Sequence, residues 1–171
     1  RPIFLVGFMG TGKTSVGAAL ARARGFDLVD TDASIEASEG RTIARLFSES
    51  GEEHFRRAER VMLEKVASRK RIVVATGGGV FLAASNRRLI RAAGPSVWLD
   101  VSLAVIRDRL GAGTARPLWT PDDAVGLRAM FERRRAVYAL ADHRVDGACG
   151  TPREVADAVV SQLDRIPGNP H

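Results

Sequence analysis

The sequence predicts an α/β fold of three layers, in which helices cover both faces of a central parallel sheet of about five strands. Short apolar runs alternate with longer segments of helical pattern, as expected when helices join parallel strands. The run Ile72–Ala75 is apolar at every position, which is typical of a strand buried on both faces. A glycine-rich turn separates the first apolar run from the first helical segment, and such turns bind phosphate in folds of this class.

Each predicted element has a local signal. The first helical segment, 13–24, contains Gly17 and four alanines, so it can pack closely on a sheet. The segment 33–69 has a helical pattern with glycines at 40 and 51, which predict breaks. In chain order, we expect strands at 2–6, 26–30, 72–75, 96–100 and 143–146, and helices at 13–24, 33–69 (in pieces), 83–93, 102–110, 123–141 and 152–165.

The chain of 171 residues is long enough for one domain with its own core. We expect this domain to span residues 1–166 and the tail 167–171 to be disordered. Residues 111–122 (GAGTARPLWTPD) contain two glycines and two prolines, which predict a loop that could act as a mobile lid.

Composition narrows the class of protein. The net charge of +6 suits a protein that binds anions, but the basic clusters 69–71 and 133–135 are short and lack interleaved aromatic residues. We therefore expect no nucleic-acid partner. No apolar stretch approaches the roughly 20 residues of a membrane span, and the single cysteine, Cys149, suits a reducing compartment. We expect a cytoplasmic monomer without a membrane partner.

The turn after the first strand reads Gly7-Phe8-Met9-Gly10-Thr11-Gly12-Lys13-Thr14, a G-x-x-x-x-G-K-T pattern. Its glycines allow backbone N–H groups to point at phosphate oxygens, and the following helix adds its dipole. Lys13 can reach the β- and γ-phosphates, and the Thr14 hydroxyl can hold Mg²⁺. The pattern predicts nucleotide binding by Gly10, Thr11, Gly12, Lys13, Thr14 and Ser15.

Two carboxylates, Asp30 and Asp32, follow the second strand. Because ligands of parallel sheets bind at the carboxyl ends of the strands, both should face the nucleotide. One could orient the waters of Mg²⁺, and the other could accept a hydrogen bond from an attacking hydroxyl. Capping of the next helix is the alternative interpretation of both residues.

The third strand ends in Thr76-Gly77-Gly78-Gly79, whose glycines let the backbone approach a ligand directly. Arg56 and Glu59 share one face of the preceding helix, and an arginine near this edge of the sheet could bind a carboxylate or phosphate. We expect the neighbouring polar residues to be surface groups: His54, Arg57 and Arg60.

Arg116, in the predicted lid, could stabilise charge on the transferred group while the closed loop excludes water. Asp100 ends the fourth strand and resembles a metal-binding aspartate, but capping of the helix that starts near Ser102 explains it equally well. The residues alone thus predict ATP, Mg²⁺ and a hydroxyl acceptor that carries an anionic group.

The ordered set of motifs resembles shikimate kinase over residues 3–165. The matching motifs are GFMGTGKTSVG (7–17), DTDxxIE (30–36), GExxFRxxE (51–59), TGGG (76–79), RPL (116–118), R-x-x-x-Y (134–138) and Thr151-Pro152. The resemblance implies a three-layer P-loop kinase fold with a mobile lid and a substrate-binding helical region at about 33–61. It also implies transfer of the γ-phosphoryl group of ATP to the 3-hydroxyl of shikimate, in the synthesis of chorismate and aromatic amino acids.

The resemblance further implies residue roles. Asp32 would bind the shikimate hydroxyls and act as the base. The other shikimate-binding residues would be Arg56, Gly77, Gly78, Gly79 and Arg134. Arg116 would be the lid arginine, Asp30 would belong to the Mg²⁺ shell through water, and the adenine would lie near Arg109, Pro152 and Arg153. Arg134 is assigned by its spacing to Tyr138, and its neighbour Arg135 is the alternative.

Three other functions stay open at this level. A gluconate-type kinase could use the same core with another acceptor, and a regulatory module could use nucleotide hydrolysis as a switch. The chain contains no Asn-Lys-x-Asp guanine-binding motif, which argues against a GTPase switch. A basic nucleic-acid-binding ATPase would show salt-sensitive affinity for DNA.

Overall fold

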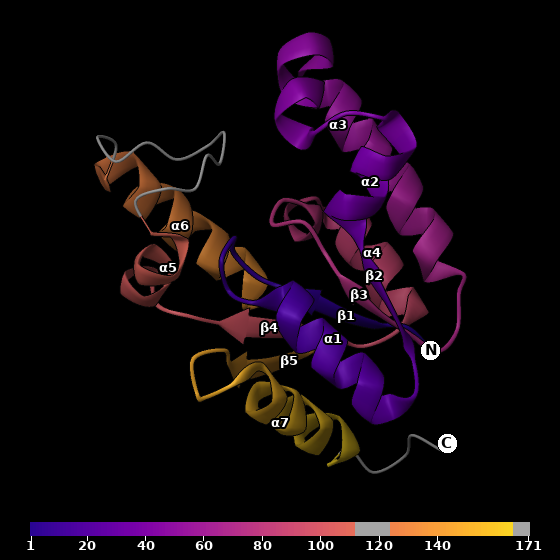
Figure 1. Ribbon diagram of the computed structural model, residues 1–171, viewed down its shortest axis with the longest axis vertical. Coiled ribbons are helices and arrows are strands. Elements are labelled where there is room, and N and C mark those ends of the chain that lie inside the picture. Colours follow the sequence, from indigo (N-terminus) through magenta and orange to yellow (C-terminus); the bar gives the residue numbers. More distant parts are fainter. Residues whose placement is uncertain (112–123, 166–171) are drawn as a thin grey trace.

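Five parallel strands form one sheet in the computed structural model, which describes residues 1–111 and 124–165 (Figure 1). In chain order the strands are β1 (Ile3–Val6), β2 (Asp27–Asp30), β3 (Ile72–Ala75), β4 (Ser96–Asp100) and β5 (His143–Asp146). Their spatial order is β2-β3-β1-β4-β5, and all four pairings are parallel. The strand that leads into the glycine-rich turn therefore lies at the centre of the sheet.

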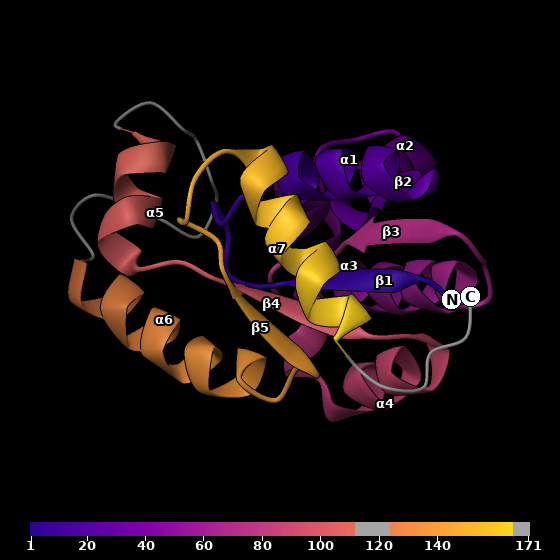
Figure 2. The same ribbon diagram turned by 90° about the horizontal axis from the view of Figure 1, so that it is seen from below.

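Helices lie on both faces of this sheet, with α1 and α7 on one side and α4 and α6 on the other (Figure 2). The helices are α1 (Lys13–Arg24), α2 (Thr31–Glu39), α3 (Ile43–Ala67), α4 (Ala84–Ala93), α5 (Leu103–Leu110), α6 (Ala124–Tyr138) and α7 (Pro152–Asp164), with the 3₁₀ helix η1 (Val80–Leu82). This arrangement confirms the predicted three-layer α/β/α fold.

Successive side chains of the central strand β1 point to opposite faces of the sheet, and a core forms on each face. Ile3 and Leu5 pack with residues of α1 and α7, whereas Phe4 and Val6 pack with residues of α3, α4 and α6. All four side chains are buried, as expected for a strand covered by helices on both sides. The two cores hold β1 rigidly, and with it the start of the turn that follows.

The boundaries differ from the prediction at a few places. Helix α2 begins at Thr31 rather than at 33 because Asp30 caps it, and α6 ends at Tyr138 rather than at 141. Helix η1 was not predicted, since three residues carry no periodic pattern. The break near Gly51 is confirmed by its non-helical φ of 82° and ψ of 168°. Residues 112–122 of the predicted lid, including Arg116, and the tail 167–171 lie outside the described residues.

Helix α2 and the first part of α3 extend beyond the end of β2, at the top of the molecule in Figure 1. They have a small core of their own, formed by Ile35, Leu46 and Phe55. The rings of Phe47 and Phe55 lie 4.9 Å apart between centroids. This third, smaller core holds the helical region as a wall above the carboxyl ends of the strands.

Candidate active site

The glycine-rich turn curls around the ammonium group of Lys13. Gly10 and Gly12 have positive φ angles of 73° and 87°, which glycine adopts without strain. The Lys13 Nζ donates hydrogen bonds to the carbonyl oxygens of Gly7 (2.9 Å) and Phe8 (2.8 Å). Thr11, which is buried, donates its hydroxyl to the same Phe8 oxygen at 2.9 Å. The lysine is thus held within the bend that its position in the motif predicts.

Thr14 and Asp30 meet at the start of α1. The Thr14 hydroxyl donates to Asp30 Oδ2 at 2.6 Å, and Asp30 Oδ1 accepts from the backbone N–H of Ala33 at 3.0 Å. Asp30 therefore caps α2 with one oxygen, which confirms the capping interpretation, and contacts Thr14 with the other, while its place in a Mg²⁺ shell stays a prediction. Two hard oxygen donors side by side fit a Mg²⁺ ion that keeps several of its waters.

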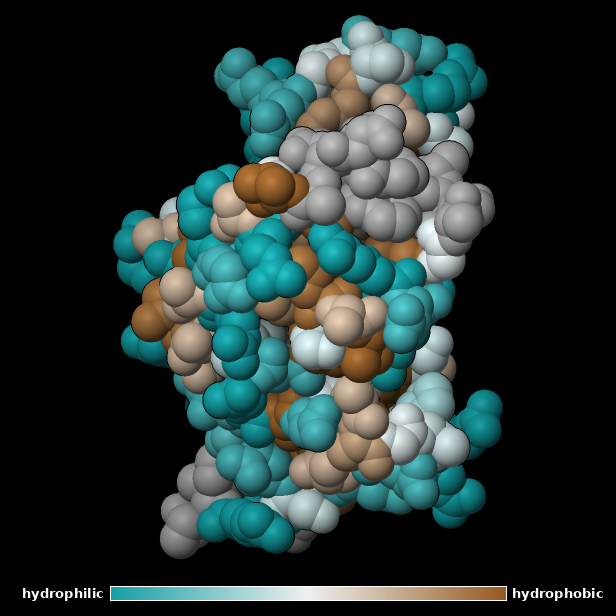
Figure 3. All heavy atoms as spheres, turned by 90° about the vertical axis from the view of Figure 1, so that its left-hand side faces the viewer, coloured by the Kyte–Doolittle hydropathy of each residue, from teal (hydrophilic) through white to brown (hydrophobic). Residues whose placement is uncertain are grey.

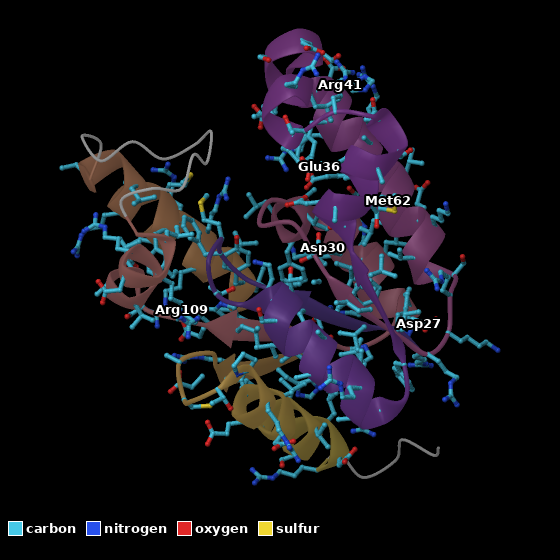
Figure 4. The ribbon with its side chains drawn as sticks, in the orientation of Figure 1. Asp27, Asp30, Glu36, Arg41, Met62 and Arg109 are labelled. Atoms are coloured by element: carbon cyan, nitrogen blue, oxygen red, sulfur yellow. The ribbon has the colours of Figure 1, made fainter. Side chains whose placement is uncertain are left out.

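A cavity of about 830 Å³ opens over the phosphate loop. Figure 4 shows Asp30 and Glu36 on one side of it and Arg109 on the other. Arg109 donates to the carbonyl oxygens of Thr11 (3.3 Å) and Gly147 (3.1 Å), so it links the loop to the segment before α7. This cavity is large enough for a nucleotide, and its lining includes the predicted residues Gly10, Gly12, Lys13, Thr14, Ser15, Asp30, Asp32, Gly77, Gly78 and Arg109.

Pro152 and Arg153 stand apart from this cavity lining in the described part of the chain. Both are exposed in the first turn of α7, whose start is fixed by a capping box between Thr151 and Glu154. Their predicted place near the adenine stays a prediction.

A second cavity, of about 120 Å³, lies beside the first, and four residues line both. Its charged residues are Asp32, Arg56, Glu59 and Arg134, and its apolar wall comes from Met9, Ile43, Phe47 and Phe55. Two carboxyl groups and two arginines therefore surround a small space that adjoins the phosphate loop. A small alcohol with an acid group fits this chemistry.

Two of the three glycines after β3 make room for charged groups of this cavity. A Cβ atom on Gly77 would lie 2.5 Å from Asp32 Oδ1, and one on Gly79 would overlap the Arg56 guanidinium. A Cβ on Gly78 would lie 3.7 Å from Arg134 Nη1. A side chain at 77 or 79 would displace a charged group of the cavity, which explains glycine at these two positions.

Arg56 is paired within its own helix. Its Nη1 donates to Glu59 Oε1 at 2.6 Å, and only 2% of Glu59 is exposed. Burial raises the pKa of Glu59, the positive charge of Arg56 opposes this rise, and the negative charge of Asp32 adds to it. The pair holds the Arg56 guanidinium at the cavity wall, where its partly exposed side can bind a carboxylate.

The structure separates the two candidate arginines on α6. Arg134 lines the small cavity, whereas Arg135 donates to Asp100 Oδ2 at 3.3 Å. Asp100 also accepts from Arg144, and Ser102 rather than Asp100 caps α5. The capping interpretation of Asp100 is therefore wrong, because its side chain belongs to an ion-pair cluster with two arginines.

Two side chains that bond to the backbone of the glycine run were not predicted from the sequence. The Thr31 hydroxyl accepts a hydrogen bond from the Gly77 N–H at 2.9 Å, and the Tyr138 hydroxyl donates to the Gly78 carbonyl at 2.6 Å. The signals available were weak. Thr31 stands between the two aspartates, and Tyr138 lies one helical turn after Arg134.

The remaining polar residues of α3 point elsewhere. His54 lies within 3.2 Å of Glu39 Oε2, a contact whose hydrogen bond lowers the pKa of Glu39, and Arg57 pairs with exposed Glu53. Arg60 donates to Glu64 and to Asn86 Oδ1. His54, Arg57 and Arg60 are absent from the linings of both cavities in the described residues.

Comparison with known proteins gives one consistent result. A family model described as shikimate kinase matches residues 9–164. A shikimate kinase of Cereibacter sphaeroides is 42% identical over 98% of this chain and 84% of its own length, and one of a Sulfurihydrogenibium species is 38% identical over 96% and 99%.

Solved structures agree with these sequence matches. A shikimate kinase of Acinetobacter baumannii in complex with shikimate has a TM-score of 0.89 and 34% identity, covering 95% of this chain and 92% of its own. A gluconokinase of Sinorhizobium meliloti has a TM-score of 0.61 and 22% identity, covering 96% and 91%, and this similarity shows the fold alone.

Proposed function

This chain belongs to the shikimate kinase family and is a kinase acting on shikimate, and we propose that it transfers the γ-phosphoryl group of ATP to the 3-hydroxyl. The observation that carries this proposal is the pair of adjoining cavities. One contains the phosphate loop, and the other contains two carboxyl groups and two arginines beside the glycine run. The arrangement suits a nucleotide and a small carboxylated alcohol bound face to face.

The positions of the charged groups support the following reaction. The Asp32 carboxylate accepts the proton of the 3-hydroxyl, whose oxygen forms a new bond to the γ-phosphorus. The bond from the γ-phosphorus to the β–γ bridging oxygen breaks, and ADP leaves with that electron pair. The Lys13 ammonium stabilises the charge that develops on the phosphoryl oxygens.

Substrate orientation is the proposed task of Arg56 and Arg134, whose guanidinium groups bind the shikimate carboxylate and so fix the orientation of the ring that carries the reacting hydroxyl. Gly77, Gly78 and Gly79 offer backbone contacts along the ring. Bound in this way, the hydroxyl stays close to Asp32 and the γ-phosphate, which converts a bimolecular reaction into a local one.

Mg²⁺ is the proposed metal cofactor, held by Thr14 directly and by Asp30 through water. The 2.6 Å contact between their oxygens supports this set. When bound, the ion neutralises charge on the β- and γ-phosphates. We further propose that the phosphate loop, Ser15, Arg109, Pro152 and Arg153 bind the nucleotide and that Arg116 closes over the phosphates.

We propose that the protein acts as a cytoplasmic monomer. On the face that carries α5 and α6, hydrophobic residues are scattered among hydrophilic ones rather than gathered in one large patch (Figure 3). Val61, Val125 and Leu140 are the large hydrophobic residues exposed in the described part of the chain. Within that part, no helix has the length and apolar character needed to span a membrane.

A coupled assay of ADP release tests the function. With ATP and Mg²⁺, we expect turnover that depends on shikimate and stays at background with gluconate. Turnover with gluconate but not shikimate would favour the other kinase class, and ATP hydrolysis without any acceptor would favour a switch.

Replacing Arg56 with alanine is expected to raise the KM for shikimate by about 10- to 100-fold, because one charge-assisted contact to the carboxylate is lost. The KM for ATP should change less than about threefold, since the phosphate loop is untouched. Steady-state kinetics with each substrate varied in turn measures both values.

The matched control is Arg57→Ala, which removes an arginine from the next position of the same helix, where it pairs with exposed Glu53. This variant should keep both KM values. Equal losses of ATP and shikimate affinity in Arg56→Ala would contradict the assigned role.

A further inference from the structure

The hydroxyl of Tyr138 is buried in the wall behind the shikimate cavity. Tyr138 ends α6 and is 2% exposed, and its O–H donates to the carbonyl oxygen of Gly78 at 2.6 Å. The two residues stand 60 positions apart in the chain. This bond therefore ties the last turn of α6 directly to the middle of the glycine run.

Arg134 stands four residues before Tyr138 on the same helix. Its guanidinium lies 5.7 Å from the centroid of the Phe8 ring, and its Nη1 faces Gly78. Arg134 and Gly78 both line the small cavity. The separation between these two groups depends on how α6 is attached to the segment after β3. Helix α6 packs on η1 in that segment, and the Tyr138 hydroxyl adds a hydrogen bond to the glycine run itself.

The hydroxyl is not needed for packing, because phenylalanine would place the same ring in the core. The aromatic ring belongs to the core and lies 6.4 Å from the Trp98 ring, between centroids. Burial raises the pKa of Tyr138 to about 12, although the charge of Arg134 opposes this shift. The hydroxyl therefore keeps its proton near neutral pH and stays a donor to the carbonyl.

Each flank of Gly78 has an anchor of its own. Thr31 accepts from the Gly77 N–H, and the Asn86 amide donates to the Val80 carbonyl at 2.9 Å. Loss of the Tyr138 bond would leave these anchors in place, so the segment would stay folded. The central carbonyl alone would lose its side-chain donor.

We propose that Tyr138 is a positioning residue for the acceptor, whose hydroxyl sets the spacing between the Gly78 backbone and the Arg134 guanidinium. The proposal presupposes shikimate as the acceptor, bound as described above. Tyr138 acts through Arg134 and Gly78 and does not itself line the cavity among the described residues.

The test is Tyr138→Phe, which removes the hydroxyl and keeps the ring. We expect the KM for shikimate to rise about fivefold, as for the loss of one hydrogen bond. The KM for ATP and kcat should stay within about twofold of wild type, because Tyr138 does not line the cavity over the phosphate loop and no hydrogen bond to the nucleotide is lost. The matched control is Ser96→Ala, which removes a buried hydroxyl bonded to Asp142 at the first residue of β4.

A double-mutant cycle with Arg134→Ala separates positioning from general loss of stability. If Tyr138 acts through Arg134, adding Tyr138→Phe to Arg134→Ala should change the KM for shikimate by less than about twofold. The proposal would be overturned if the two substitutions had fully additive effects on the KM for shikimate. It would also be overturned by an unchanged KM in Tyr138→Phe or by the same KM shift in Ser96→Ala. Failure of the wild-type enzyme to use shikimate would instead overturn the proposed function.

Discussion

Replacing Lys13 with alanine is expected to lower kcat by about a hundred- to a thousandfold, the usual effect of removing one preorganised group that stabilises transition-state charge. Lys13 is 9% exposed, and its ammonium group is held by the carbonyl oxygens of Gly7 and Phe8. It therefore sits in the bend of the phosphate loop without needing a conformational search when the γ-phosphoryl group moves.

The fold should survive this change. The glycines that shape the loop remain, and β1 stays buried between two cores. Thermal unfolding monitored by circular dichroism should give a midpoint within a few degrees of wild type, and the coupled assay measures kcat.

Lys65→Ala is the matched control, because Lys65 is an exposed lysine on α3 away from both active-site cavities. It should keep wild-type turnover. The phosphate-loop mechanism would be contradicted if Lys13→Ala kept more than about a tenth of wild-type activity. That loss would be far smaller than is usual for a group that stabilises transition-state charge.

Replacing Asp32 with asparagine is expected to reduce kcat by about a hundred- to ten-thousandfold, the range for loss of a general base. Asparagine has almost the same shape, so it should still fit beside Gly77, but it cannot accept the hydroxyl proton. The KM for ATP should change little. Asp32 is placed by the first turn of α2, whose start is fixed by the Asp30 cap and by Thr31.

Asp27→Asn provides the control for this second prediction. Asp27 begins the same strand that ends in Asp30, and its exposed carboxylate lies 3.6 Å from Arg69 on the surface. Its removal should leave kcat unchanged. An unchanged kcat in Asp32→Asn would exclude Asp32 both as base and as the group that orients the hydroxyl.

Local sequence was sufficient wherever one contiguous segment makes the structure. The phosphate loop lies within eight consecutive residues, and its glycine angles and lysine position follow from their order. The strand β3 and the helix α1 have the predicted bounds, since uniform apolarity and small-residue content are properties of the segment itself. Asp30 caps α2 as predicted and still leaves its other oxygen for Thr14, because the cap and that contact use different oxygens.

Residues that meet across the chain were harder to predict. Sequence spacing favoured Arg134 over Arg135, but the rotation of α6 against the sheet is what turns one towards the cavity and the other towards Asp100. The apolar wall of Phe47 and Phe55 depends on how the two parts of α3 pack around the break at Gly51.

The sequence by itself determined the fold class, the phosphate loop and the set of charged residues from which the acceptor site is built. Only the tertiary structure decided which of those residues share one cavity and which backbone atoms hold them. Thr31 and Tyr138 bond to Gly77 and Gly78 from 46 and 60 residues away. Such contacts depend on strand order and helix rotation, which are set when the two cores pack on the sheet. Because the residues involved are far apart in the chain, these contacts leave no local sequence pattern.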